Sequence, residues 1–359
     1  MANMNIGTPR FYTDQVNYYL SKGTAATEFT LNESVGIAAQ TGSAAELFDM
    51  NPLNQVTFDT TASSGANHVL VNLDMQSERP KSFIAVLNHN LFTARGKIRF
   101  FAGNAIGDVD ALDGTGNDVD WSAVTTTEAV NADSIITGGS DNSVVVEPAA
   151  DGSTVFTFTE TSQRFWGIQF EGATHTNGAS NATNEVWNAT YDFRVANILI
   201  GEVYSMPHNP DMQVVRNIIM GGNDIVESYS GRRFSNMRWY GRQADSSTLS
   251  RSPFATSQYA HGLHSGRLRY DMDFSYLAST DVMPDEYGTI DNDDDNVISD
   301  IWENTLGSHI PFIFSIDKDA DAATNESEHL FARFSQDSLK MTQVANQIWN
   351  LNMSIEEEF

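Results

Sequence analysis

The stretch SFIAVLNHNLFTARGKIRFFA, Ser82–Ala102, decides the fold class of this chain. It holds two short apolar runs, Phe83–Leu87 and Ile98–Phe101, on either side of the polar turn Asn88–Asn90. Every residue of the first run is apolar, so neither face of the strand would be polar. This pattern predicts a strand covered on both faces. The second run carries Arg99 before two phenylalanines, which predicts a strand with one wetter edge. We interpret the stretch as the inner strand pair of a β-sandwich, to which later strands add.

A β pattern continues on both sides of this pair, over residues 31–206. Every second residue of 68–75 is apolar, which places these side chains on one face of a strand. Residues 103–152 are instead rich in Gly, Asp, Asn, Thr and Ser, and we expect a long loop there, at the rim of the sandwich. The double-proline turn Pro207–Pro210 then indicates a domain boundary. We therefore predict a sandwich domain over 31–206, preceded by an N-terminal arm over 1–30.

The second half, 207–359, predicts a β-rich assembly domain with one helix. Apolar residues alternate with charged or polar ones in Arg267–Phe274 and again in 348–355, so each strand has one apolar face. Between them, 296–306 has an apolar stripe at helical spacing, an acidic cap before it and Gly307 after it. The order of strands, helix and strands favours a small α+β or barrel-like domain. The whole chain is thus predicted to be mainly β.

The composition restricts the partners of this protein. Its 359 residues include 47 Asp and Glu against 20 Lys and Arg, a net charge of −27. Such a charge repels phosphate groups, which argues against nucleic acid or an anionic membrane as the main partner. The absence of cysteine excludes disulfides and thiol nucleophiles. The first residues lack the pattern of a signal peptide, and no apolar run approaches the roughly 20 residues of a spanning helix, so we expect synthesis in a cytoplasm without membrane insertion.

The N-terminal arm is rich in aromatic residues but too short for a core of its own. Arg10, Phe11 and Tyr12 lie in it, and such a segment needs another surface to cover it. Two interpretations stay open. The arm packs on its own domain, or it docks on a neighbouring subunit.

A basic and aromatic cluster stands out in the second half of this acidic chain. It includes Arg233, Arg238, Trp239 and Tyr240. Nucleic acid is one interpretation, but isolated clusters of this kind more often pair with an acidic surface of the same chain or of a partner. Because Arg and aromatic residues are enriched at interface hot spots, we predict a subunit contact.

One segment has the ligand spacing of a calcium loop. Asp317, Asp319, Asp321 and Glu328 occupy positions one, three, five and twelve, and carboxylate oxygens suit this hard cation. Ala322 stands where such loops carry a glycine, and the flanks predict strands instead of helices. A solvated hairpin loop is therefore the preferred interpretation, with Ca²⁺ as the alternative. No other cofactor is indicated.

The sequence lacks the motifs of serine nucleophiles, zinc proteases and nucleotide-binding loops. We therefore predict no catalytic residues and no enzyme activity. Two residues could contact a ligand at the rim of the sandwich: His89 in the polar turn and Trp121 in the expected loop. For His89, a turn that caps its own backbone is the simpler interpretation.

Two sets of short motifs resemble structural proteins of bacteriophage particles. The first set resembles a galactose-binding-like jelly roll found in tail-associated virion proteins: Leu87–Leu91, Ile98–Phe101, Phe165–Phe170 and Ile198–Val203. The second set is similar to the opening of such proteins and to the β-domains of distal tail proteins: Thr8–Asp14, Arg269–Phe274, Pro311–Phe314 and Trp349–Glu356. The long segment 103–152 departs from a minimal jelly roll, and no sugar-binding residue set carries over.

The resemblance implies a jelly-roll β-sandwich in a virion structural protein of the tail tip or baseplate. Such a protein would form a homo-oligomeric ring that joins the tail tube to receptor-binding components. Its partners would be copies of itself, other tail proteins and, in one alternative, a host surface glycan. That alternative is a carbohydrate-binding adhesin or tail-fibre component. A capsid decoration protein and an enzyme that cleaves host polysaccharide are the others.

Overall fold

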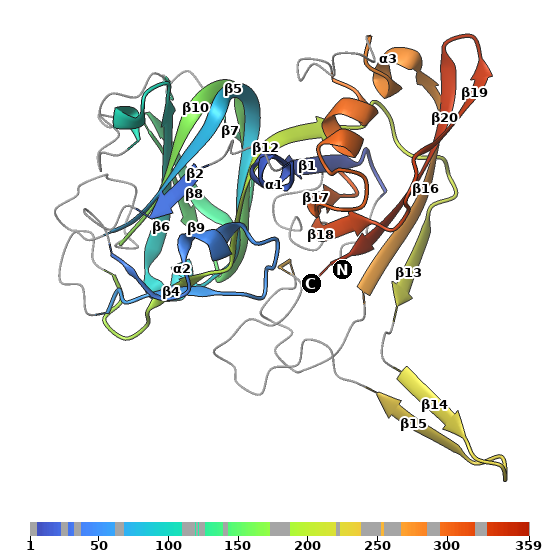
Figure 1. The fold of residues 1–359 in the computed structure, drawn as a ribbon, viewed down its shortest axis with the longest axis horizontal. Coiled ribbons are helices and arrows are strands. Elements are labelled where there is room, and N and C mark those ends of the chain that lie inside the picture. Colours follow the sequence, from blue (N-terminus) through green and yellow to red (C-terminus); the bar gives the residue numbers. More distant parts are fainter. Residues whose placement is uncertain are drawn as a thin grey trace.

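The computed structural model describes residues 6–22, 28–31, 37–61, 68–109, 119, 121, 126–138, 143–172, 187–219, 223–237, 253–254, 267–285, 295–319 and 329–358. Strands are the main secondary structure of these residues, and most of the strands belong to one large antiparallel sheet. Figure 1 shows two β-rich parts side by side, a sandwich and a second part, joined by strands that run between them. This architecture confirms the predicted fold class, a β-sandwich followed by a β-rich unit.

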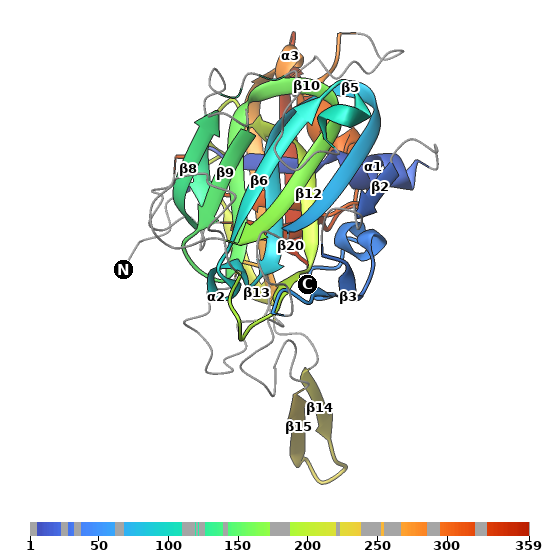
Figure 2. The same ribbon diagram turned by 90° about the vertical axis from the view of Figure 1, so that its left-hand side faces the viewer.

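Two long strands, β5 (His68–His89) and β10 (Gly152–Gly172), form the frame of the sandwich. They pair antiparallel, and register shifts interrupt the pairing around Thr161, where both strands bend. On one side of the bend β10 pairs with β6 (Gly96–Gly103), and on the other side β5 pairs with β12 (Asn197–Ser205). Each long strand therefore contributes to both layers of the sandwich, as the view in Figure 2 shows.

Shorter elements complete the sandwich. The strands are β2 (Glu28–Leu31), β3 (Ala39–Thr41), β4 (Val56–Phe58), β7 (Thr126–Val130), β8 (Ala132–Gly138), β9 (Ser143–Pro148) and β11 (Phe193–Val195). The helices are α1 (Gln15–Ser21), α2 (Leu91–Ala94), and the 3₁₀ turns η1 (Ala44–Phe48) and η2 (Ile106–Asp108). The expectation of one long loop over 103–152 is thus wrong, because it contains β7, β8 and β9. The alternating Val144 and Val146 of β9 pack into the core, and their burial holds this strand in place.

The stretch Ser82–Ala102 is partly as predicted. Residues 83–87 are all buried, which confirms a strand covered on both faces. However, β5 and β6 are not direct neighbours, because β10 lies between them. The wetter edge expected at Arg99 is also wrong. Arg99 is buried on the face of β6 opposite the main core, where its Nη2 lies 2.8 Å from Oε1 of Glu171.

The second part continues the same sheet. Its strands are β13 (Val215–Ile219), β16 (Arg267–Ala278), β17 (Phe312–Ser315), β18 (His329–Phe334), β19 (Lys340–Ala345) and β20 (Ile348–Glu357), with the short helix α3 (Ser279–Val282). The helix predicted over 296–306 is present as a π-helix, η4 (Val297–Glu303). It begins at Asn296, whose side-chain oxygen accepts a hydrogen bond from Ser299 N at 2.8 Å.

The predicted N-terminal arm is part of the central sheet. Its strand β1 (Arg10–Asp14) lies between β12 and β17 and joins the sandwich to the second part. A Cβ atom on Gly201 of β12 would lie 2.0 Å from the backbone oxygen of Thr13, so only glycine permits this close approach. Of the two interpretations of the arm, the structure shows packing on its own chain.

Candidate functional site

The hairpin of β14 (Asn223–Glu227) and β15 (Arg233–Met237) projects away from the rest of the molecule in both views (Figures 1 and 2). Its two strands form a separate two-stranded sheet. The turn between them is closed by Ser228 N, which donates to the oxygen of Arg232 at 2.8 Å, and by Gly231 with a φ of +77°. Glu227 and Arg233 are register partners on either side of the turn and form an ion pair of 3.2 Å. The β14–β15 hairpin is thus a short, regular element that projects into solvent.

This hairpin exposes apolar side chains on both of its faces. Val226 and Phe234 are register partners on one face and are 57% and 54% exposed. Ile225, the adjacent residue, lies on the opposite face and is 56% exposed. Tyr229 at the tip is fully exposed. An isolated two-stranded hairpin is at best marginally stable in water, so apolar exposure of this kind marks a contact surface.

The edge strand of the large sheet, which precedes the hairpin in the chain, also exposes apolar side chains. β13 is the terminal strand of the sheet order and pairs with β16. Val215 and Ile218 on β13 are 40% and 60% exposed, and Met212 just before it is fully exposed. We use the name assembly surface for the seven exposed apolar residues of β13 and the hairpin: Met212, Val215, Ile218, Ile225, Val226, Tyr229 and Phe234.

The charge of the hairpin differs from that of the whole chain. Arg232 and Arg233 lie at its tip, and the guanidinium of Arg232 sits 5.4 Å from the ring centroid of Phe234. The chain as a whole carries a net charge of −27. Opposite potentials favour contact between such a tip and the surface of an acidic partner. Of the predicted interface residues, Arg233 lies here, while Arg238, Trp239 and Tyr240 lie outside the described residues.

The interface predicted for the N-terminal residues is wrong for two of the three. Phe11 is 0% exposed and Tyr12 is 2% exposed, because β12, β17 and the two cores cover them. Arg10 is half-buried, and its Nε donates to Ser205 Oγ at 3.0 Å. These side chains stabilise the joint between the two parts of the chain.

The ligand contacts predicted for His89 and Trp121 are also wrong, since both side chains are 0% exposed. Nδ1 of His89 accepts a hydrogen bond from Leu91 N at 3.3 Å, and its Nε2 lies 2.8 Å from Thr154 Oγ1. Burial lowers the pKa of His89 to about 3, so its ring is neutral. The turn therefore caps its own backbone, as in the simpler interpretation. Trp121 packs edge-on against Phe100, with ring centroids 4.9 Å apart.

The predicted calcium loop is only half described. Asp317 and Asp319 follow β17, and Oδ1 of Asp317 accepts a hydrogen bond from Asp319 N at 3.1 Å. Asp319 also pairs with Lys318 at 3.1 Å. Asp321 and Glu328 lie outside the described residues, and within the described ranges no three metal-binding side chains gather. Calcium binding stays a prediction.

A cluster of buried carboxyl groups lies between the two parts of the chain, and the sequence patterns gave no sign of it. Burial, with repulsion from Glu160 and Asp295, raises the pKa of Glu202 to about 8. Burial, with repulsion from Glu202, raises the pKa of Asp300 to about 9. Glu202 is on β12 and Asp300 on η4, and both side chains are at most 5% exposed. With pKa values raised to about 8 and about 9, both groups are neutral near pH 7.

No protein-family model matches the sequence, and no curated protein matches it. Within the described residues, no helix has both the length and the apolar character needed to cross a membrane.

Several solved structures of carbohydrate-binding proteins are similar to part of the chain. Chitosan-binding module 1 of a Paenibacillus chitosanase/glucanase shows 11% identity and a TM-score of 0.28, covering 49% of this chain and 94% of that one. A family 32 carbohydrate-binding module of Clostridium perfringens NanJ, solved with galactose, shows 10% identity and a TM-score of 0.29, covering 53% and 98%. A fucolectin from striped bass (Morone saxatilis) serum shows 11% and 0.29, covering 74% and 71%.

Proposed function

We propose that this chain is a structural subunit without enzyme activity that assembles with copies of itself through the assembly surface. The β14–β15 hairpin carries this proposal, because it projects from the body and exposes Ile225, Val226 and Phe234 on two faces. A hairpin with two apolar faces is stabilised when it inserts between elements of another molecule. Arg232 at its tip, beside the Arg233–Glu227 ion pair, would suit an acidic surface, and a second copy of this chain, with its net charge of −27, offers one.

The biological setting that we propose is the tail tip or baseplate of a bacteriophage particle. The chain would be made in the host cytoplasm and become part of a ring that contacts other tail proteins. The resemblance of the sequence motifs supports this setting. Closed rings suit a hairpin that reaches from one copy to the next, because each copy then both gives and receives one contact.

Light scattering after size-exclusion chromatography tests the assembly. The full chain should elute as an oligomer of defined mass. The double substitution Val226→Asp with Phe234→Ser removes the apolar pair from one hairpin face and should yield the monomer. The matched control is Val344→Asp, at an apolar residue of β19 that is 48% exposed and lies outside the assembly surface. A monomeric wild-type chain, or an oligomer that survives the double substitution, would contradict the proposal.

Glycan binding is the alternative function. It was expected at His89 and Trp121, and burial of both residues removes that site. A glycan therefore requires a site elsewhere on the chain.

A further inference from the structure

The outer face of three neighbouring strands in the second part is lined by polar side chains. On β16 and β20 the inward residues Met272, Phe274, Leu351 and Met353 are buried, as the alternation in the sequence predicts. The residues between them point to the other face. Register pairs Asn352 of β20 with Asp273 of β16 on one side and with Lys340 of β19 on the other. One row across the sheet therefore carries a carboxylate, an amide and an ammonium group.

A groove of about 250 Å³ lies over this row. Its polar lining comes from Asp211, Asp273, Ser275, Lys340, Thr342, Asn350 and Asn352. Such a volume lies just below the ~300–1,000 Å³ range of small-molecule sites. It suits a ligand of one or two rings.

Hydrogen bonds fix several of these side chains before any ligand arrives. Nδ2 of Asn352 donates to Oδ1 of Asp273 at 2.8 Å. Oγ of Ser275 donates to Oδ2 of Asp211 at 2.6 Å, and Asp211 N donates to the backbone oxygen of Asp273 at 2.8 Å. The strand backbone therefore holds the floor of the groove, and its polar groups need little reordering on binding.

An exposed aromatic residue, Tyr276, is bonded through its backbone to a residue of the groove lining. Tyr276 follows Ser275, and its backbone N–H donates to Oδ1 of Asn350 at 3.2 Å. Its φ of +63° is rare for a bulky side chain and coincides with a bulge in the pairing of β16 with β20. The side chain is 78% exposed. Strain of this kind is maintained where the surroundings impose it, and it often accompanies a functional position.

We propose that this groove binds a neutral saccharide of one or two sugar units. Sugar hydroxyls both donate and accept hydrogen bonds, and the groove offers both kinds of group. The carboxylates of Asp211 and Asp273 accept, Lys340 donates, and the amides of Asn350 and Asn352 can do either. The exposed ring of Tyr276, next in the chain to the lining residue Ser275, would supply an apolar surface for the C–H face of a pyranose ring.

The charges of the lining select against other ligand classes. Asp211 and Asp273 repel an anion such as phosphate. Lys340 beside Asn352 weakens the site for a divalent cation, which prefers an uninterrupted set of oxygen ligands. A mixed lining of this type fits a ligand with no net charge.

A printed glycan microarray of neutral, sialylated and uronic-acid glycans tests the proposal with the full chain. Neutral glycans should bind, and Asn352→Ala and Tyr276→Ala should each reduce binding at least tenfold. Lys340→Ala should also weaken binding and provides a variant that folds, because Lys340 is exposed on β19. The matched control is Asp271→Asn, which removes a carboxylate on the same face of β16 but outside the groove lining. It should bind as the wild type does.

Three results would overturn the inference. They are no binding to any neutral glycan, binding that survives all three groove variants, or titration calorimetry with CaCl₂ that shows Ca²⁺ bound in the groove and lost in Asn352→Ala. Light scattering on the same variants keeps this test separate from the assembly proposal. Groove variants should leave the oligomer intact, and the hairpin variant should leave glycan binding per subunit unchanged.

Discussion

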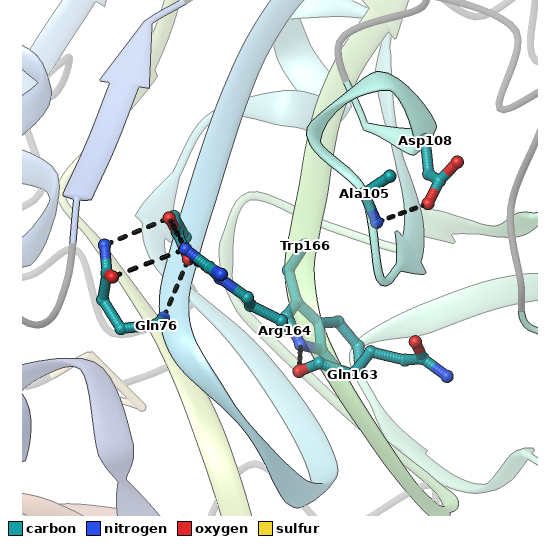
Figure 3. A network of polar contacts seen from close by, with 7 residues as sticks. Gln76, Ala105, Asp108, Gln163, Arg164 and Trp166 are labelled. Atoms are coloured by element: carbon teal, nitrogen blue, oxygen red, sulfur yellow. Dashed lines mark hydrogen bonds and ion pairs between the residues drawn. The ribbon is translucent and has the colours of Figure 1, made fainter.

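Arg164 and Asp74 form a two-point ion pair at the bend of the two long sandwich strands. Nε of Arg164 lies 2.8 Å from Oδ1 of Asp74, and its Nη2 lies 2.9 Å from Oδ2. The backbone N–H of Gln76 donates to the same carboxylate at 2.8 Å, and Gln76 and Arg164 lie side by side in Figure 3. Here β5 turns through a left-handed residue, Gln76 with φ +59°, and leaves its register with β10. The ion pair holds the two strands together where the ladder is interrupted.

Acid should weaken the sandwich through this pair. Burial works to raise the pKa of Asp74, but the hydrogen bonds from Arg164 and Gln76 outweigh it and leave the pKa below its usual 3.8. A carboxyl with a lowered folded-state pKa adds stability above its unfolded pKa and loses it as the pH falls. The melting temperature of the wild type should therefore fall further between pH 6 and pH 3 than that of the Asp74→Asn variant. Parallel melting profiles for the two proteins would contradict this role.

The contact between β1 and β12 should not tolerate a single added methyl group. Gly201→Ala places a Cβ against the backbone oxygen of Thr13, and backbone atoms cannot move aside as a flexible side chain can. We expect a loss of about 1–3 kcal/mol in the free energy of unfolding, the usual cost of overpacking. Urea denaturation measures it. Gly107→Ala is the control, because a Cβ there meets no atom within 4 Å. Equal stability of the two variants would show that β1 does not lie in the sheet.

The joint between the two parts should weaken as the pH rises from 5 to 7. The folded pKa values of Glu202, about 8, and Asp300, about 9, lie above their usual values of 4.5 and 3.8. Groups with raised folded-state pKa values give stability below the unfolded pKa and lose it progressively up to the folded pKa. Burial lowers the pKa of Lys81 to about 7, so its opposing effect acts only above that pH.

Melting temperatures of the wild type, Glu202→Gln and Asp300→Asn at pH 5, 6 and 7 check this expectation. The wild type should melt at progressively lower temperature as the pH rises. Each neutral variant should lose part of that slope, because it keeps the hydrogen-bonding shape of a protonated carboxyl at every pH. A slope unchanged in both variants would show that these groups are ionised in the folded protein.

Local patterns predicted the sheet faces well. Apolar and polar residues alternate in Arg267–Phe274 and 349–355, and the structure buries the apolar members Tyr270, Met272, Phe274, Leu351, Met353 and Ile355. Leu268 and Trp349 are partly buried against the same core. The same patterns gave the polar face of the groove, although its ligand chemistry was not foreseen, because the register between β16, β19 and β20 is set by tertiary pairing.

Long-range contacts explain the errors. From the sequence alone, the five residues of β1 are assigned to an arm, because their partner strands β12 and β17 lie far along the chain. His89 stands in a locally polar turn, and sequence alone does not show that Thr154 and a core close over it. The basic cluster at Arg233 was identified, but the projection of its hairpin from the body is a property of the assembled fold.

Photo-crosslinking from the hairpin tip tests the central claim most directly. The chain contains no cysteine, so Tyr229→Cys accepts a single benzophenone label at the fully exposed tip. Labelled protein made with ¹⁵N is mixed with unlabelled ¹⁴N protein, and mass spectrometry identifies the joined peptides. The same label at Ile106→Cys, on an exposed residue of η2 in the sandwich, is the control. We expect mixed ¹⁵N–¹⁴N crosslinks from position 229 and not from position 106. Crosslinks from position 229 confined to a single copy, or none at all, would contradict assembly through the hairpin.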